Sequence, residues 1–521
     1  MSPVRKQSAT GGRAKALTNI LTNWGAFAVS AVISFFLAPF VVHSLGNEAY
    51  GVWILLSSLV GYLGLLDLGV RGAVTKFVAA HHAAARHDAA SRIASAALAV
   101  FGIAGIIAIL ASGIMAGFGL HVFEISAAYE NLAPQVLVLG GLTIAVTIVG
   151  GVFGGVVVAR QRFDLLNASS ILIAMIRAIA IVLTLRSGGG LLDLALVQLG
   201  VSVGQSLVSV LLSRWVYPEL RVRPTTFTSE DLKKVLSFGI YASLLHVASA
   251  LMLYSDSLVI GTFLPVELIT FFAIATNLTD HARAVISGIS TTITPMASAL
   301  EGSDGIDRVR EVLLTGARYA TLISLPMVIT FMFRGHTFIG LWMGPEYAQP
   351  AGDVLILLSV VLLVSSSFQI CTATMIGLNK HPGMVPAFAV EAIANVRLSI
   401  GLISRFGIYG VAMGTLIPRL VVALAFGPWY VRRAVGTPIR RFLWLSLLRP
   451  GLSMIPFALA SWIIDAFWAT PNLIIFFAQI VVASPAALLG AWLVFLTREE
   501  RHEYSTLIRQ TLSASHSENV Q

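Results

Sequence analysis

The chain has 521 residues, of which 57% are hydrophobic and only 11% charged, and its mean hydropathy is +0.85. Soluble globular domains carry about a quarter charged residues, so this composition excludes a soluble enzyme and predicts a membrane protein. Its apolar runs do not alternate strictly, which excludes a closed barrel. The net charge of +9 is attributed to membrane topology, and we expect no nucleic-acid partner.

Apolar runs long enough to cross a bilayer recur along the chain, since a crossing needs about 20 mostly apolar residues. We therefore expect an all-α polytopic membrane protein with about 14 transmembrane helices. The expected helices are 18–43, 48–70, 91–118, 133–159, 164–185, 191–213, 232–262, 267–299, 314–340, 353–377, 384–404, 407–431, 446–468 and 473–496.

The basic residues predict the orientation of these helices. Most of the 34 lysines and arginines fall on one side, and cytoplasmic loops carry an excess of Lys and Arg. Both termini should therefore be cytoplasmic, and a bacterial inner membrane fits the short loops. Only Arg186, Arg334 and Arg405 are assigned to the opposite side. The basic segment 1–17 has no signal-peptide cleavage site, so we expect the first helix to be retained.

The seventh expected helix weakly repeats the first. Aligning 21–59 with 240–278 places Leu45 on Leu264 and Glu48 on Glu267. Six helices per repeat insert both copies the same way up, and transporters built in this way bind substrate between the halves. The expected organisation is a cytoplasmic tail 1–17, an N-lobe 18–213, a cytoplasmic linker 214–231, a C-lobe 232–431, two further helices within 446–496 and a cytoplasmic tail 497–521.

The segment LGNEAYGVWILLSSLVGYLGLLDLGVRGAVTKFVA (45–79) contains a Gly-x-x-x-Tyr-Gly-x-Trp turn followed by Leu-Asp-x-Gly. It resembles the signature of the polysaccharide-transport, O-antigen flippase (Wzx-type) family, within the multidrug, oligosaccharidyl-lipid and polysaccharide exporter superfamily. Segments 339–359 and 375–383 resemble the family's turns into and out of helix ten, and Pro295 resembles its proline in helix eight. The resemblance implies a V-shaped pair of parallel six-helix bundles that flips a lipid-linked oligosaccharide to the periplasmic leaflet.

Several polar residues near the middle of expected helices are candidates for cargo binding. An arginine that faces lipid there costs at least ~2.5 kcal/mol, so we expect deep arginines to face the bundle interior or water. Guanidinium forks bind phosphate oxygens in two places at once, whereas packing against carbonyls or helix ends is the alternative role. The cargo candidates are Arg177, Arg283, Arg397, Arg419, Asn277 and Asn23.

Polar residues form one stripe along the expected eighth helix, because they recur at steps of three and four. The stripe is Thr276, Asp280, Arg283, Ser287, Ser290 and Thr294, and the far face is Leu278, Ala282, Val285, Ile289, Ile293 and Met296. We interpret this helix as a water-facing wall backed by lipid or protein.

Five residues are candidates for coupling or gating. Asp280 lies three residues before Arg283 and either pairs with it structurally or serves transport. His281 titrates near neutrality, although a lone histidine is more often a hydrogen-bonding core residue. Glu391 lines the cavity or joins helices. Asp67 and Arg71 are placed at a cytoplasmic helix end, as gate-closing or snorkelling residues. Coupling to H+ or Na+ stays open.

The chain lacks the Walker, His-Glu-x-x-His, Cys-x-x-Cys and Gly-x-Ser-x-Gly motifs. We therefore expect no catalytic residue, metal site or cofactor. The expected function is a flippase for an undecaprenyl-diphosphate oligosaccharide that works by alternating access, with the bilayer and a polysaccharide polymerase machinery as further partners.

Three alternatives stay open. A cation-coupled multidrug exporter would need a cavity dominated by carboxylates. The charge pattern does not distinguish a lipid II flippase from an oligosaccharide flippase. A membrane glycosyltransferase or ligase would need acidic residues on a substantial outer loop, whereas the outer loops 262–267 and 405–407 are short.

Overall fold

The computed structural model describes residues 9–223, 226–303 and 305–506, except for the side chains of 9–24, 26, 238–246 and 301–303. All regular secondary structure in the described ranges is helical. Twelve helices there are long and apolar enough to cross a membrane. Two further long helices, α8 (Ser229–Phe263) and α9 (Glu267–Ser303), lie at the other two expected crossings. The predicted all-α polytopic membrane fold is confirmed.

The chain divides into two compact units. The first is Met1–Ala273 with Ser399–Val411, and the second is Ile274–Leu398 with Ala412–Gln521. This division falls inside α9, whereas the expected linker between two repeats is 214–231. The expected boundary between the lobes stays a prediction.

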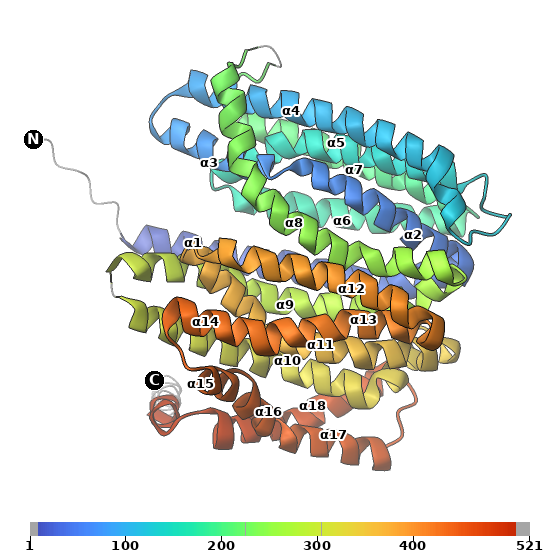
Figure 1. The fold of residues 1–521 in the computed structure, drawn as a ribbon, viewed down its shortest axis with the longest axis vertical. Coiled ribbons are helices and arrows are strands. Elements are labelled where there is room, and N and C mark those ends of the chain that lie inside the picture. Colours follow the sequence, from blue (N-terminus) through green and yellow to red (C-terminus); the bar gives the residue numbers. More distant parts are fainter. Residues whose placement is uncertain (1–8, 224–225, 304, 507–521) are drawn as a thin grey trace, which may run out of the picture. The chain divides into compact units, whose positions relative to one another are not determined.

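The first unit is built around α5, which packs against α4 and α7, and the three helices run side by side in Figure 1. Small residues permit close packing, because a Cβ on Gly155 would lie 3.3 Å from the backbone oxygen of Arg71. Its helices are α1 (Ala9–Leu45), α2 (Asn47–Leu63), α3 (Val70–Ala83), α4 (His87–Ile114), α5 (Ala133–Ala159), α6 (Phe163–Arg186), α7 (Leu191–Val216) and α8.

Helix α3 replaces most of the basic loop expected at 71–90. The expected second helix ends early, because α2 stops at Leu63 and the 3₁₀ turn Gly64–Asp67 follows. Val70, Ala73, Val74 and Val78 are buried on α3. These positions recur at helical spacing, so the basic segment forms an amphipathic helix whose apolar face joins the core of the first unit.

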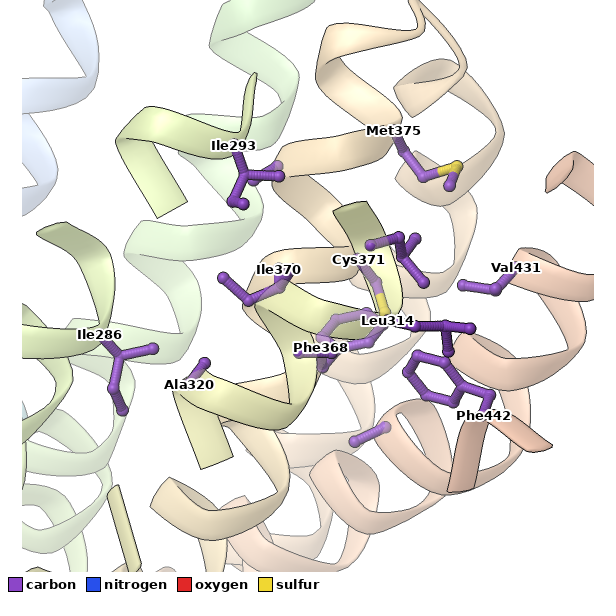
Figure 2. Close-up of a cluster of buried hydrophobic side chains, with 14 of the residues drawn as sticks. Ile286, Ile293, Leu314, Ala320, Phe368, Ile370, Cys371, Met375, Val431 and Phe442 are labelled. Carbon is purple, nitrogen blue, oxygen red and sulfur yellow. The ribbon is translucent and has the colours of Figure 1, made fainter. Parts of the chain in front are cut away.

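The second unit is centred on α10 and α11, which pack against each other along their length. Figure 2 shows its core, where Ile286 and Ile293 of α9 lie among side chains of α10, α11 and later helices. Its other helices are α10 (Ile306–Trp342), α11 (Pro345–Gly377), α14 (Gly427–Val435), α15 (Ile439–Leu443), α16 (Arg449–Ser453), α17 (Ile455–Phe467) and α18 (Leu473–Gly490), while α9, α12 (Val385–Phe406) and α13 (Ile408–Val421) contribute to both units.

Some expected helix ends are wrong in the second unit. Helix α10 begins at Ile306, eight residues before the expected start at 314, and α11 begins at Pro345 instead of 353. Both starts follow a glycine with positive φ, Gly305 and Gly344. Short 3₁₀ or π turns also interrupt or join helices at Met115–Gly119, Leu120–Val122, His381–Met384, Val422–Phe426, Trp444–Leu448 and Ala491–Phe495.

Candidate functional site

Arg283 and Asp280 form an ion pair on α9. Arg283 Nη1 donates to Asp280 Oδ1 over 2.7 Å, and the two side chains are 41% and 38% uncovered by protein. The neighbouring Ala282 and Ile286 are buried in the core of the second unit. The polar pair therefore lies on a face of α9 that protein only partly covers, while the apolar face of the same helix packs in the core of the second unit.

The polar stripe of α9 is water-facing over a shorter length than the sequence suggests. Gln369 Nε2 of α11 donates to Ser287 Oγ over 2.7 Å, and Thr294 Oγ1 donates to the backbone oxygen of Ala373 over 3.1 Å. Helical spacing identifies a face but not its neighbour, and here α11 covers the later part of the stripe. Ser287 and Thr294 are half-buried, whereas Ser290 between them is buried, so the expected water-facing wall is wrong at Ser290.

Polar side chains on α12 meet polar groups on α13 at regular intervals. In the second unit, Glu391 Oε1 lies 2.8 Å from Arg419 Nε, and Asn395 Nδ2 donates to Thr415 Oγ1 over 2.8 Å. Both α12 residues are buried. The contacting residues are four apart on each helix, and they run in opposite directions along the two helices. One face of α12 therefore packs against α13.

The Glu391–Arg419 pair is the most enclosed part of this region. Glu391 is 1% exposed, and neither carboxylate oxygen has a hydrogen bond to any described residue. The Arg419 guanidinium lies over the Phe368 ring at 5.7 Å, and Arg283 is near enough to act on it electrostatically. We call Asp280, Arg283, Glu391 and Arg419 the charge cluster. Each of its arginines lies within 2.8 Å of a carboxylate oxygen, so the charges within the cluster balance.

The other two deep arginines are exposed and have no ion pair with a described residue. Arg177 lies on the side of α6 opposite the exposed Leu172, Ile179 and Leu183. Such a position fits an arginine that avoids lipid.

Arg397 of α12 is placed differently. It shares its face with the exposed Val390, Ile393 and Ile400, because these residues are spaced by three and four. This face of α12 is the one that does not hold Glu391.

The remaining candidates are placed as follows. Asn277 and His281 are half-buried one turn apart on α9, and Asn23 lies in α1 among the side chains outside the described residues. Asp67 Oδ2 lies 3.7 Å from Arg71 Nε, and Arg71 also lies against Gly151 of α5 in the first unit. Asp67 and Arg71 therefore join a turn to α5, whereas Asp280, His281 and Arg283 share one segment of α9.

Arg334 was assigned to the outer side, which stays a prediction, and the structure places it inside α10, eight residues before the end of that helix at Trp342. Its side chain is 1% exposed, and Nε donates to Asp465 Oδ1 over 2.9 Å. Nη2 donates to Thr470 Oγ1 over 3.0 Å and to Gln479 Oε1. This network, the outer clamp, joins α10 to α17 and α18. The only sequence signal is an arginine and an aspartate inside separate apolar runs.

A second clamp joins the other end of α10 to the end of the chain. Arg318 Nη2 donates to both carboxylate oxygens of Glu500, over 2.5 and 2.7 Å. The backbone N–H of Thr497 also donates to Glu500. Burial raises the pKa of Glu500, but the Arg318 and Thr497 hydrogen bonds outweigh it and hold the pKa below its ordinary value.

The residues that carry the family resemblance lie at close contacts between segments and at helix ends, and several of them are inside α2. Gly51 must be glycine, because a Cβ there would collide with the backbone oxygen of Val266. Gly69 has a φ of 68° at the start of α3. In the segment 375–383, Lys380 Nζ donates to the backbone oxygen of Ala434 over 2.8 Å. These contacts position helices.

The comparisons agree with this structural interpretation. The family described as "Polysaccharide biosynthesis protein" matches residues 45–351. The putative O-antigen transporter of Shigella flexneri is 20% identical over 427 residues, which cover 80% of this chain and 98% of that protein. The probable flippase AglR of Haloferax volcanii is 23% identical over 403 residues, covering 76% and 79%. These relatives are named as transporters, not as enzymes.

A solved structure shares the fold. The lipid II flippase MurJ, in an inward closed conformation, matches with a TM-score of 0.70 over 91% of this chain and 98% of its own. The sequence identity is 14%, so this likeness describes the helical architecture alone.

Proposed function

This chain belongs to the polysaccharide biosynthesis protein family, and on that premise we propose that it flips an undecaprenyl-diphosphate oligosaccharide from the cytoplasmic to the periplasmic leaflet of a bacterial inner membrane. In this proposal both termini are cytoplasmic, and a polymerase machinery receives the glycan outside. The observation that carries the proposal is the half-uncovered Arg283 inside a membrane helix, held by Asp280.

The chemistry of Arg283 fits a diphosphate. Within the described part of the chain, only Nη1 of its guanidinium has a partner, so Nε and Nη2 remain as donors. A guanidinium presents donors in a fixed fork that matches phosphate oxygens. Asp280 restricts the side chain without using that fork completely. We therefore assign Arg283 to the diphosphate, with Arg419 as the neighbouring charge.

The charge cluster also weighs against a multidrug exporter. A cationic drug needs a carboxylate that is free to pair with it, whereas Asp280 and Glu391 each have an arginine within 2.8 Å. A lipid II flippase would bind the same diphosphate on the same residues. The naming of the Shigella relative as an O-antigen transporter favours a polysaccharide repeat unit as the cargo.

A deletion strain tests the proposed function. We expect undecaprenyl-diphosphate oligosaccharide to accumulate on the cytoplasmic side, and wild-type protein to clear it. Arg283→Ala should insert in the membrane but fail to clear the intermediate. Arg186→Ala, which removes an exposed arginine at the end of α6, is the matched control. Unchanged lipid-linked glycans together with altered drug sensitivity would support the exporter instead.

A further inference from the structure

Four helix ends of the first unit meet at a cluster of aromatic and basic side chains. His82 lies near the end of α3, His87 begins α4, Arg160 follows α5 and Tyr217 follows α7. The His82 and Tyr217 ring centroids are 4.9 Å apart, and the Arg160 guanidinium lies over the Tyr217 ring at 5.6 Å. His87 Nδ1 is 2.8 Å from the Tyr217 hydroxyl. We call these four residues the helix-end cluster.

Two buried nitrogen atoms in this cluster lack partners. Arg160 Nε and His82 Nδ1 have no hydrogen bond to any residue that the structure describes. Buried polar groups are nearly always paired, and an unpaired one points to an absent water, ion or ligand. Arg160 as a whole is half-buried, so part of its guanidinium can be reached from outside.

Capping of the nearby helix ends does not explain Arg160. Elsewhere in the chain, Arg310 donates to the backbone oxygen of Val435 over 2.9 Å and 3.1 Å, and Lys380 donates to that of Ala434. Those two side chains satisfy the end of α14, as basic residues commonly do. Arg160 makes no such bond to a described carbonyl, although it directly follows the last residue of α5.

The charges around the cluster favour an anion. Arg160 is a permanent cation. Glu219 is an acid that acts electrostatically on His82 and Tyr217, but it forms no ion pair with Arg160 among the described residues. The neighbouring Arg162 is already paired, because its guanidinium binds both oxygens of Asp164. Arg160 is therefore the arginine in this turn with donors to spare.

We propose that the helix-end cluster binds a phosphate group, supplied by the headgroup of an anionic phospholipid or by free phosphate. Arg160 donates to the phosphate oxygens, and His82 adds a second donor. Tyr217 keeps the guanidinium in place through its ring, and His87 fixes the Tyr217 hydroxyl. The cluster lies on the side of the membrane that the basic residues predict to be cytoplasmic. Anionic headgroups on that side attract arginines. This site is independent of the proposed cargo site.

The test uses the full-length protein in detergent with phosphatidylcholine alone, with added phosphatidylglycerol, or with added inorganic phosphate. Native mass spectrometry counts bound phosphatidylglycerol, and thermal unfolding follows stabilisation by each ligand. We expect Arg160→Met to lower the binding affinity for whichever ligand binds the wild type by about tenfold. Arg162→Met, which removes the same charge two residues away, should behave like the wild type. His82→Phe keeps a ring beside Tyr217 and should weaken binding even if Arg160→Met fails to fold.

The ligand that binds identifies the source of the phosphate. Binding of phosphatidylglycerol alone indicates a headgroup site, whereas a response to inorganic phosphate indicates a free-phosphate site. The proposal is wrong if neither ligand binds the wild type, or if His82→Phe and Arg160→Met both bind as the wild type does. An equal loss in Arg162→Met would also overturn it, because general surface charge would then account for binding.

Discussion

The second unit contains three arginine–carboxylate pairs inside its apolar helices, and the two that each have a nearly fully buried member, Arg334–Asp465 and Glu391–Arg419, differ in their surroundings. In the outer clamp, Arg334 donates to Asp465, Thr470 and Gln479. In the charge cluster, Glu391 lies 2.8 Å from Arg419, yet its oxygens have no hydrogen bond to a described residue. The Glu391 carboxylate therefore lacks, among the described residues, the further hydrogen bonds that the outer clamp has.

This difference separates structural from functional charges. A buried ion pair holds a fold together only when further hydrogen bonds offset the loss of solvent. The outer clamp meets that condition and docks α17 and α18 on α10. The Glu391 carboxylate has no such hydrogen bond to a described residue, and proteins break such packing rules mainly at functional sites. A set of variants can establish whether the two pairs really differ.

The largest loss of stability should come from the outer clamp. Arg334→Met removes the hydrogen bonds to Asp465 and Thr470 and leaves Gln479 Oε1 with only the one from Thr470. Breaking a buried pair costs about 3–5 kcal/mol, and because Asp465 is 40% uncovered we expect the lower end of that range. Thermal unfolding of the purified protein measures the loss, with Arg186→Met as a control. An unchanged unfolding temperature would show that the clamp does not stabilise the docking.

Glu391→Gln should have an intermediate effect on stability. The substitution keeps the shape and removes one charge, and there are few hydrogen bonds to lose. Arg419 is 15% uncovered and keeps its contact with Phe368, so we expect a loss of about 1–2 kcal/mol. Transport should fall more than stability does. A loss as large as that of Arg334→Met would contradict the distinction between the two pairs.

Among the variants of the three pairs, Asp280→Asn should change stability least. Both partners are about two-fifths uncovered, and pairs of that kind contribute roughly 0–1 kcal/mol. We nevertheless expect slower clearance of the lipid-linked intermediate, because Arg283 loses the group that orients it. Normal clearance by a stable Asp280→Asn protein would show that the pair has no role in transport.

The smallest effect should be a pH dependence at the second clamp. Because the pKa of Glu500 is held below its ordinary value, the contribution of this carboxylate is complete at neutral pH and is lost as the pH falls through the lowered native-state pKa. Hydrogen exchange across 498–506, taken relative to the intrinsic exchange rate at each pH, should rise as the solution is acidified. Glu500→Gln should exchange quickly at every pH, and a pH-dependent response in that variant would assign the effect to another group.

The sequence predicts the membrane fold well but predicts side-chain neighbours poorly. Apolar runs locate the crossings because their length is set by the bilayer. They miss α3, since its basic residues mask the buried spacing from Val70 to Val78, although that spacing is visible in the sequence. They also do not reveal the partners of Arg334, because these lie over 130 residues further along the chain.

In the candidate site, too, contacts within one helix are predictable and contacts between helices are not. The Asp280–Arg283 pair is predictable because both residues lie within one turn of one helix. The pairing of Glu391 with Arg419 depends on how α12 packs against α13, and the covering of Ser287 depends on α11. Patterns within one helix therefore identify candidate charges, whereas their partners come from tertiary packing.

Reconstituted transport tests the central claim most directly. Purified protein in proteoliposomes receives a short-chain prenyl-diphosphate oligosaccharide, and enzymatic accessibility of the glycan reports translocation. We predict that wild-type protein and Arg186→Ala translocate the glycan, whereas Arg283→Ala retains its fold and loses translocation. Wild-type rates in correctly folded Arg283→Ala would contradict the assignment of the diphosphate to this arginine.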